Sequence, residues 1–210
     1  MKTIYGIDIH DGRCGLSFSG GADSAILLYI LLTNIKDTLH LYSFYSQGKA
    51  EIAEPITDRV LQKCIELSGN NNVVHHKEFI KKQTPPVIHN MLQSYIERDN
   101  LVKMYNGISK FPPDEIINTF HEKIKSESPV IYQRRKNDAV YELYFGDKQS
   151  FYRPFANFDK KDIAGLYKLL NLEQQLFSIT RSCENTNSPL QHCSRCFWCE
   201  ERYWGFGYLE

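Results

Sequence analysis

Apolar residues along the first 125 positions follow two alternating periods, one typical of strands and one typical of helices. Short apolar runs that predict strands are followed four times by longer segments with helical spacing. The run over 22–32 is apolar on nearly every side, as expected of a helix packed under a sheet. The predicted strands cover 13–18, 39–45, 72–79 and 101–108, and the predicted helices cover 22–32, 54–67, 85–98 and 114–125. This alternation predicts an α/β fold with a doubly wound parallel sheet.

The pattern changes in the last third of the chain. Residues 126–153 end in a stretch of alternating aromatic and polar residues around Gly146, which predicts a β-hairpin insertion. Asp159 is placed to cap a final helix, with Asp162 in its first turn, where the helix dipole favours a negative charge. Residues 177–210 form a cysteine-containing tail. We expect one domain over the whole chain.

Charge excludes some classes of partner. Twenty-five basic and 25 acidic residues balance, so no field of the whole molecule attracts nucleic acid or an anionic membrane. The longest apolar stretch, 25–32, is too short to span a bilayer, and the N-terminus lacks the apolar core of a signal peptide. Arg134-Arg135-Lys136 favours a solvated hairpin base over a nucleic-acid contact. We expect a cytoplasmic protein without membrane contact and without nucleic acid as its direct substrate.

The six cysteines fall into two groups. Cys14 and Cys64 stand alone in apolar surroundings and are expected in the core. The other four share the tail in a C-x9-C-x2-C-x2-C spacing, which supplies the four thiolates of a tetrahedral structural zinc site. These predicted ligands are Cys183, Cys193, Cys196 and Cys199. An iron–sulfur cluster and free thiols are the alternatives.

A glycine-containing loop lies where the first long predicted strand gives way to a helix. It reads Ser19-Gly20-Gly21-Ala22-Asp23-Ser24. Glycines there permit positive φ and a close approach of the backbone, and a helix N-terminus offers free N–H groups to an anion. Ser19 and Ser24 add hydroxyl donors, while Asp23 is suited to bind Mg²⁺ or to hold the N–H groups of the loop. The simpler alternative is a tight turn whose serine and aspartate only cap the helix.

This string resembles the S-G-G-x-D-S signature of the PP-loop ATP pyrophosphatases. The resemblance implies that the loop grips the β- and γ-phosphates of ATP and that the enzyme forms AMP and pyrophosphate. It also implies a PP-loop fold, with adenine near the end of the second strand. The implied ATP contacts are Phe18, Ser19, Gly20, Gly21, Ala22, Asp23, Ser24, Ser43, Phe44 and Tyr45.

The tail resembles one branch of that family, the 7-cyano-7-deazaguanine synthases. The matching features are Ser182-Cys183, the C-x-x-C-x-x-C run, Arg202 and Gly205-Phe206. Upstream, the segment 153–163 resembles the branch's Pro-hydrophobic…Thr-Lys-x-Glu-Ile pattern, with Lys160 at the lysine. Lys160 is implied to neutralise phosphate, and the alternative is a solvated lysine in the first turn of a helix.

The branch implies an ATP-dependent ligase with Mg²⁺ and structural Zn²⁺. Its members adenylate the carboxylate of 7-carboxy-7-deazaguanine, let ammonia displace AMP, and dehydrate the amide to the nitrile. Implied catalytic residues are Ser19, Asp23, Ser24 and Lys160. The middle of the chain departs from the branch, because the Val-Pro-Gly-Arg-Asn segment that members of the branch carry is missing here. Ser109, Lys110 and Asp114 occupy the expected substrate region, where the alternative is a solvated loop and helix cap.

Two other functions stay open from the sequence: adenylation of another substrate such as an RNA base, and a non-catalytic nucleotide-binding module. Aromatic residues around the tail cysteines favour core packing or a homodimer interface over a platform for stacking bases. They are Trp198, Tyr203, Trp204 and Tyr208.

Overall fold

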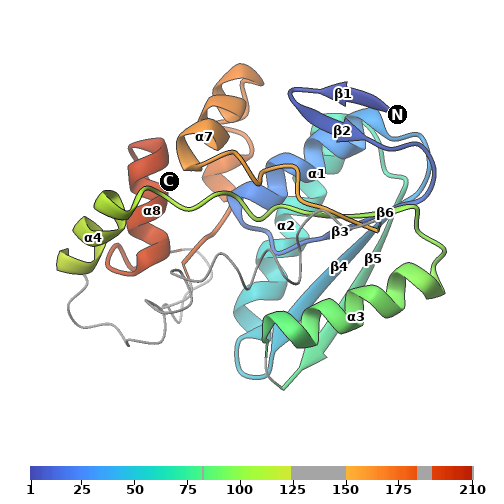
Figure 1. The fold of residues 1–210 in the computed structure, drawn as a ribbon, viewed down its shortest axis with the longest axis horizontal. Helices are drawn as coiled ribbons and strands as arrows, with labels where there is room; N and C mark the ends of the chain where they lie inside the picture. The colour runs from blue at the N-terminus through green and yellow to red at the C-terminus, as the bar shows by residue number, and fades with distance from the viewer. Residues whose placement is uncertain (82, 124–149, 184–190, 210) are drawn as a thin grey trace.

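A five-stranded parallel sheet organises the protein (Figure 1). The computed structural model describes residues 1–81, 83–123, 150–183 and 191–209. The strand order is β5-β4-β3-β6-β7, and every neighbouring pair is parallel. The strands are β3 (Cys14–Ser17), β4 (Leu39–Ser46), β5 (Val73–Ile80), β6 (Lys103–Asn106) and β7 (Phe151–Tyr152). The expected doubly wound parallel sheet is therefore confirmed.

Helices cover both faces of this sheet. In Figure 1, α3 lies in front of the strands, whereas α1 and α2 lie behind them. The helices are α1 (Ala22–Asn34), α2 (Ala50–Ser68), α3 (Pro85–Arg98), α4 (Asp114–Lys123), α7 (Lys160–Leu169) and α8 (Phe197–Phe206), with a 3₁₀ turn η1 (Phe177–Ile179). Among the described residues, no helix is both long enough and apolar enough to cross a bilayer.

The strand order reverses at β3. From β3 the chain adds β4 and β5 on one side, then returns to add β6 and β7 on the other. In open parallel sheets, ligands bind outside the carboxyl ends of the strands where the order reverses. The segments that follow β3 and β6 therefore meet where the strand order reverses, and a Cβ on Gly107 would lie 3.1 Å from the Cα of Ser24.

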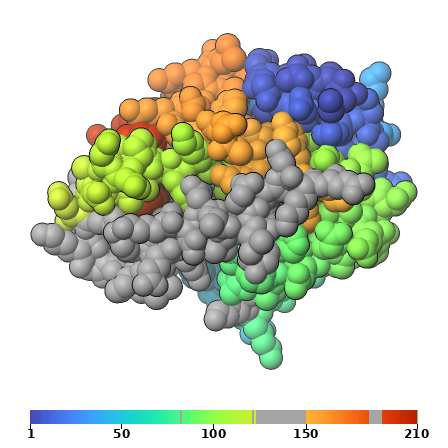
Figure 2. Space-filling view, viewed as in Figure 1, coloured from blue at the N-terminus to red at the C-terminus, as the bar shows by residue number. Residues whose placement is uncertain are grey.

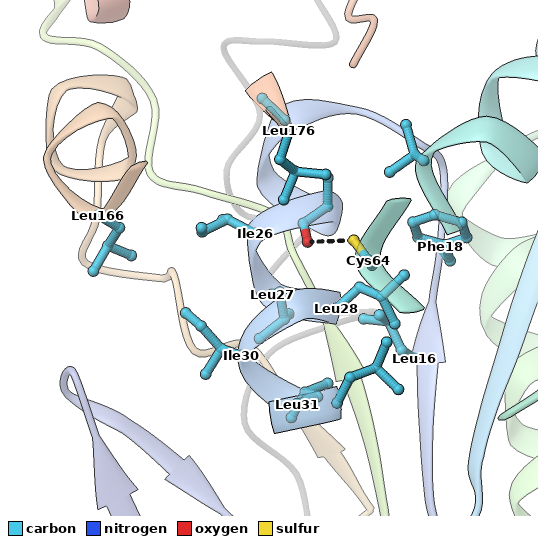
Figure 3. Packing of buried hydrophobic residues seen from close by; sticks show 14 of the residues in the cluster. Leu16, Phe18, Ile26, Leu27, Leu28, Ile30, Leu31, Cys64, Leu166 and Leu176 are labelled. Carbon is cyan, nitrogen blue, oxygen red and sulfur yellow. Dashed lines mark hydrogen bonds between the residues drawn. The ribbon is translucent and has the colours of Figure 1, made fainter. Parts of the chain in front are cut away.

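Helix α1 is the centre of the core, because it is covered on almost all sides (Figure 3). Ile26, Leu27 and Leu28 are fully buried. The Cys64 thiol from α2 donates to the Ala25 carbonyl over 3.6 Å, and burial raises its pKa. Cys14 is also fully buried, so both isolated cysteines are core residues as expected.

Two elements of the described chain lie outside the sequence-based expectation. An N-terminal hairpin pairs β1 (Lys2–Ile4) with β2 (Ile7–Ile9), and its turn residues Tyr5 and Gly6 both have positive φ. The last two strand residues of the expected 126–153 hairpin instead pair with β6 in parallel, as β7. Most of that expected hairpin, including the basic cluster at 134–136, lies outside the described residues.

The carboxyl-terminal elements gather at one side of the sheet. In Figure 1, α4, α7 and α8 lie together near the C-terminus. Figure 2 shows the corresponding surface, where the segment that follows residue 150, in orange, separates the N-terminal hairpin from α4. This arrangement brings Lys160 and the cysteine tail towards the start of α1.

Candidate functional site

The loop between β3 and α1 has a backbone that requires glycine at position 20. Gly20 has φ +72°, and a Cβ there would lie 3.2 Å from the Cα of Thr57. Gly21 is the N-cap of α1 and makes no side-chain cap hydrogen bond. The first turn of α1 therefore offers N–H groups that no capping side chain covers, which is the arrangement that favours an anion.

Two serine hydroxyls close the loop on itself. The Oγ atoms of Ser19 and Ser24 lie 3.2 Å apart, and Ser24 Oγ also donates to the Gly21 carbonyl over 3.1 Å. Ser24 is buried, whereas Ser19 is exposed and can turn towards a ligand. Ser24 thus holds the shape of the loop, and the hydroxyl of the exposed Ser19 is the one that a ligand could reach.

Asp23 connects this loop to segments far away in the sequence. Its Oδ2 accepts hydrogen bonds from Ser109 Oγ, over 2.9 Å, and from Lys160 Nζ. Its Oδ1 is buried and has no hydrogen-bond partner among the described residues. A buried carboxylate oxygen that lacks a partner is costly, so Asp23 fits a ligand that brings positive charge, such as Mg²⁺.

Lys160 begins α7 as a buried residue, only 8% exposed, and the solvated alternative is therefore wrong. Its Nζ also donates to Ser109 Oγ over 3.2 Å and lies 3.8 Å from Glu201 Oε2 on α8. Close packing of α8 on α7 fixes this position, because a Cβ on Gly205 would lie 2.4 Å from the Cβ of Lys160. The structure thus brings together Asp23, Ser109, Lys160 and Glu201.

In the expected adenine region, hydrogen bonds within the protein already hold the polar side chains. Ser43 is fully buried, and its Oγ donates to the Phe18 carbonyl over 2.7 Å and contacts His75 Nε2 at 2.8 Å. Tyr45 Oη lies 2.5 Å from Thr57 Oγ1. Strand β3 pairs with β4 only as far as the bond from Phe18 N to the Tyr42 carbonyl. The groups at this end of β4 that an adenine base could contact are the backbone edge beyond Tyr42 and the half-buried ring of Phe44.

Four cysteine thiols converge in the tail. All four sulfur atoms lie within 4.8 Å of one another. Cys196 Sγ is 3.5 Å from Cys199 Sγ and 4.0 Å from Cys183 Sγ, and Cys193 Sγ is 4.0 Å from Cys199 Sγ. Sulfurs about 2.3 Å from a tetrahedral zinc lie about 3.8 Å apart, so the donor set fits zinc. Helix α8, whose N-cap is Cys196, links this cluster to Glu201.

Arg202 ties the cysteine cluster to the core. It is 1% exposed, donates to Phe177 and Leu209 carbonyls and to Thr180 Oγ1, and lies 3.7 Å from the centre of the Phe177 ring. Burial lowers its pKa to about 10, so it remains charged at neutral pH. Were the four cysteines to bind zinc as thiolates, this buried guanidinium on the same helix as Cys199 would offset part of their negative charge.

Other residues singled out in the sequence lie around this centre. Lys110 and Asp114 are exposed, so only Ser109 of that trio contacts the Asp23 network. Trp204 packs beneath the Lys161 ammonium at 4.9 Å, and Tyr208 donates to Glu173 over 2.9 Å. Sequence reasoning missed Glu201, because only the folding of the tail against α7 places that carboxylate near Lys160.

The fold and the site define a class: a doubly wound parallel α/β protein with a glycine loop at its switch point and a four-cysteine centre. No protein-family model matches the chain, and no curated protein matches it. Among solved structures, the chain is similar to the NH₃-dependent NAD synthetase from Campylobacter jejuni in complex with the nitrate ion. That likeness has 14% sequence identity and a TM-score of 0.49, covering 79% of this chain and 66% of the other.

Proposed function

We propose that this protein is an ATP-dependent ligase that forms AMP and pyrophosphate while it converts a carboxylate to an amide. The observation that carries the proposal is the position of the Ser19–Ser24 loop. It lies at the carboxyl end of the central strand, at the start of α1, with uncapped N–H groups and with Asp23 beside the buried Lys160. Such a cradle suits a polyphosphate better than a neutral ligand.

The residues divide the chemistry between binding and charge. The N–H groups of the first turn of α1 and the Ser19 hydroxyl bind the β- and γ-phosphates. Asp23, through its unpartnered Oδ1, would hold Mg²⁺, which would offset the charge of the phosphates. Lys160 faces the same carboxylate and stabilises charge that develops as pyrophosphate leaves.

The reaction needs no nucleophilic side chain. An oxygen of the substrate carboxylate attacks the α-phosphorus of ATP, and the bond to pyrophosphate breaks. Ammonia then attacks the acyl carbon, AMP departs with the bonding electrons, and the nitrogen loses a proton. Because a carboxylate is a poor electrophile, adenylation supplies the leaving group, and positioning provides most of the remaining acceleration.

For the substrate we propose 7-carboxy-7-deazaguanine, with the amide, the nitrile or both as products. The support is the resemblance at the two ends of the chain: the glycine loop and the tail with its four cysteines, Arg202 and Gly205-Phe206. The structure adds that these two ends meet, since Lys160 links Asp23 of the loop to Glu201 of the tail helix.

The test incubates the purified protein with ATP, Mg²⁺, ammonium and 7-carboxy-7-deazaguanine, and measures AMP and the mass of the base. We expect AMP that depends on the base, together with amide or nitrile. Release of AMP only with added RNA would instead indicate adenylation of an RNA base. ATP binding without AMP, in a folded and zinc-loaded protein, would indicate a nucleotide-binding module.

A matched pair of variants links that activity to the site. Lys160→Met removes the ammonium that faces Asp23, and we expect at least about a hundred-fold loss of AMP formation. Lys161→Met changes the next residue, which is exposed, and should keep activity within about two-fold. Equal losses in both variants, with equal zinc content and thermal stability, would contradict the role of Lys160.

A further inference from the structure

A second group of metal-ligating side chains lies away from the glycine loop. His40 stands near the start of β4, His76 lies on β5, and Asp99 directly follows α3. His40 and Tyr42 are two residues apart on β4, so their side chains point to the same face of the sheet. Tyr42 is the register partner of His76, so all three side chains share the face that α3 covers. The glycine loop, by contrast, follows the carboxyl end of β3. The group is therefore separate from the nucleotide site.

Its three ligand atoms are spaced for one ion. They lie within 4.8 Å of one another. Nδ1 of His40 is 3.2 Å from Nε2 of His76 and 4.0 Å from Oδ2 of Asp99. Nitrogen and oxygen ligands about 2.1 Å from a tetrahedral ion lie about 3.4 Å apart, so a small adjustment of the rings accommodates the ion.

Neighbouring side chains hold these residues in place, as the hydrogen-bond partners of metal ligands do. Tyr42 Oη donates to Asp99 Oδ2 over 2.5 Å, and Arg98 donates to both carboxylate oxygens. The Tyr42 ring stacks on His76, with centroids 4.7 Å apart and 7° between the planes. A carboxylate has about four lone-pair sites, and these three bonds occupy two on Oδ2 and one on Oδ1, so one site on Oδ1 is left for a ligand bond. Side chains that orient metal ligands in this way raise affinity.

Access also suits a cation. The side chains of His40 and Asp99 are 12% and 15% exposed, so the group is neither sealed nor freely solvated.

We propose that His40, His76 and Asp99 form a second metal site, which binds a first-row divalent transition ion such as Zn²⁺. Two imidazoles and one carboxylate are a donor set for such an ion and leave a coordination position for water. The ion would tie β4 and β5 to the end of α3, independently of the cysteine centre and of ATP.

The test counts ions in the full-length protein. Equilibrium dialysis against Zn²⁺, followed by elemental analysis, should find two ions in the wild type and one in His40→Gln, His76→Gln and Asp99→Asn. His89→Gln, on α3 at the same sheet face, is the matched control and should keep two. Tyr42→Phe removes only the outer hydrogen bond and should weaken the second ion about 10- to 100-fold.

A spectroscopic measurement keeps the test independent of the ligand variants. Co²⁺ added to wild-type protein that already carries one Zn²⁺ should give d–d bands without thiolate charge transfer. A single bound ion in the wild type, or a second ion retained in both histidine variants, would overturn the proposal. Absence of the thiolate-free Co²⁺ bands would overturn it too, whether or not the variants fold.

Discussion

At the scale of single residues, Gly205 positions a charged side chain. The absent methyl group lets α8 approach α7 so closely that a Cβ there would lie 2.8 Å from the Lys160 carbonyl oxygen. Lys160 is thereby buried against Asp23 rather than extended into solvent. A glycine in a helix interior costs roughly 0.5–1 kcal/mol relative to alanine, and here the tight packing compensates for it.

Gly205→Ala should therefore destabilise the protein, although alanine is the better helix former. We expect a loss of about 1–3 kcal/mol in the free energy of unfolding, because the added methyl group overpacks the contact of α7 with α8. The matched control is Gly165→Ala on α7, where a Cβ would meet nothing within 4 Å. That variant should be more stable by roughly 0.5–1 kcal/mol. Denaturant unfolding measures both, and equal shifts would contradict this account.

His75 provides a prediction about pH. Burial lowers its pKa to about 4, while its Nδ1 lies 3.8 Å from Asp58. The unfolded chain, with an ordinary histidine pKa near 6.5, binds the proton more readily. Stability is therefore full above about pH 6.5 and falls as the pH decreases towards 4, by up to about 3 kcal/mol from this residue.

His75→Gln should flatten part of that decline. Unfolding free energies of the wild type and the variant, measured between pH 4 and 8, should converge as the pH falls. Some decline should persist in the variant, because burial also lowers the pKa of His40 and of His76. If the two curves ran parallel, His75 would not account for the expected part of the decline in unfolding free energy.

At the scale of elements, helix α7 begins with a reciprocal cap. The Asp159 carboxylate accepts from the N–H groups of Lys161, over 2.7 Å, and Asp162, over 3.2 Å, and the Asp162 carboxylate accepts from the Asp159 N–H. The sequence predicted the cap by Asp159 and the place of Asp162 in the first turn, and the structure adds the reciprocal bond from the Asp159 N–H to Asp162. It matters for the site, because the next residue is Lys160.

Asp159→Ala should destabilise the protein by about 1 kcal/mol, since two N–H groups lose their acceptor. Thr84→Ala provides the control. Thr84 is the N-cap of α3 but makes no side-chain cap hydrogen bond, so its loss should cost distinctly less. Thermal unfolding of both variants distinguishes the two, and a larger effect at Thr84 would contradict the assignment.

At the scale of the whole molecule, the two ends of the chain meet around one buried charge cluster. Cys196 and Cys199 fix the start of α8, and α8 carries Glu201 towards Lys160 and Asp23. A metal ion in the cysteine centre would therefore stabilise the tail and, through it, the wall of the candidate ATP site.

Cys196→Ser should lose one equivalent of zinc and lower the melting temperature, because it removes a predicted ligand that is 2% exposed. Cys64→Ala, a core substitution outside the cluster, should lower stability while it keeps that zinc. Elemental analysis together with thermal unfolding checks both. Full zinc content and an unchanged melting temperature in Cys196→Ser would refute a structural zinc role for the cluster.

Local chemistry allowed the sequence by itself to determine several features. The alternation of apolar runs predicted the parallel sheet and α1, and the aspartate pair predicted the start of α7, because these depend on neighbours along the chain. Cysteine spacing predicted a cluster whose four sulfurs do converge. The Ser19–Ser24 string indicated an anion-binding turn, because the shape of such a turn also depends on neighbours along the chain.

Only the tertiary structure decided what surrounds these features. The burial of Lys160, the proximity of Glu201 and the convergence of His40 with His76 depend on segments far apart in the chain. The neighbouring histidines 75 and 76 illustrate the reason: successive strand residues face opposite sides, so one meets Ser43 and the other meets Tyr42. Sequence fixes the side chain and the local backbone, whereas the packing of distant elements determines its partners and its charge.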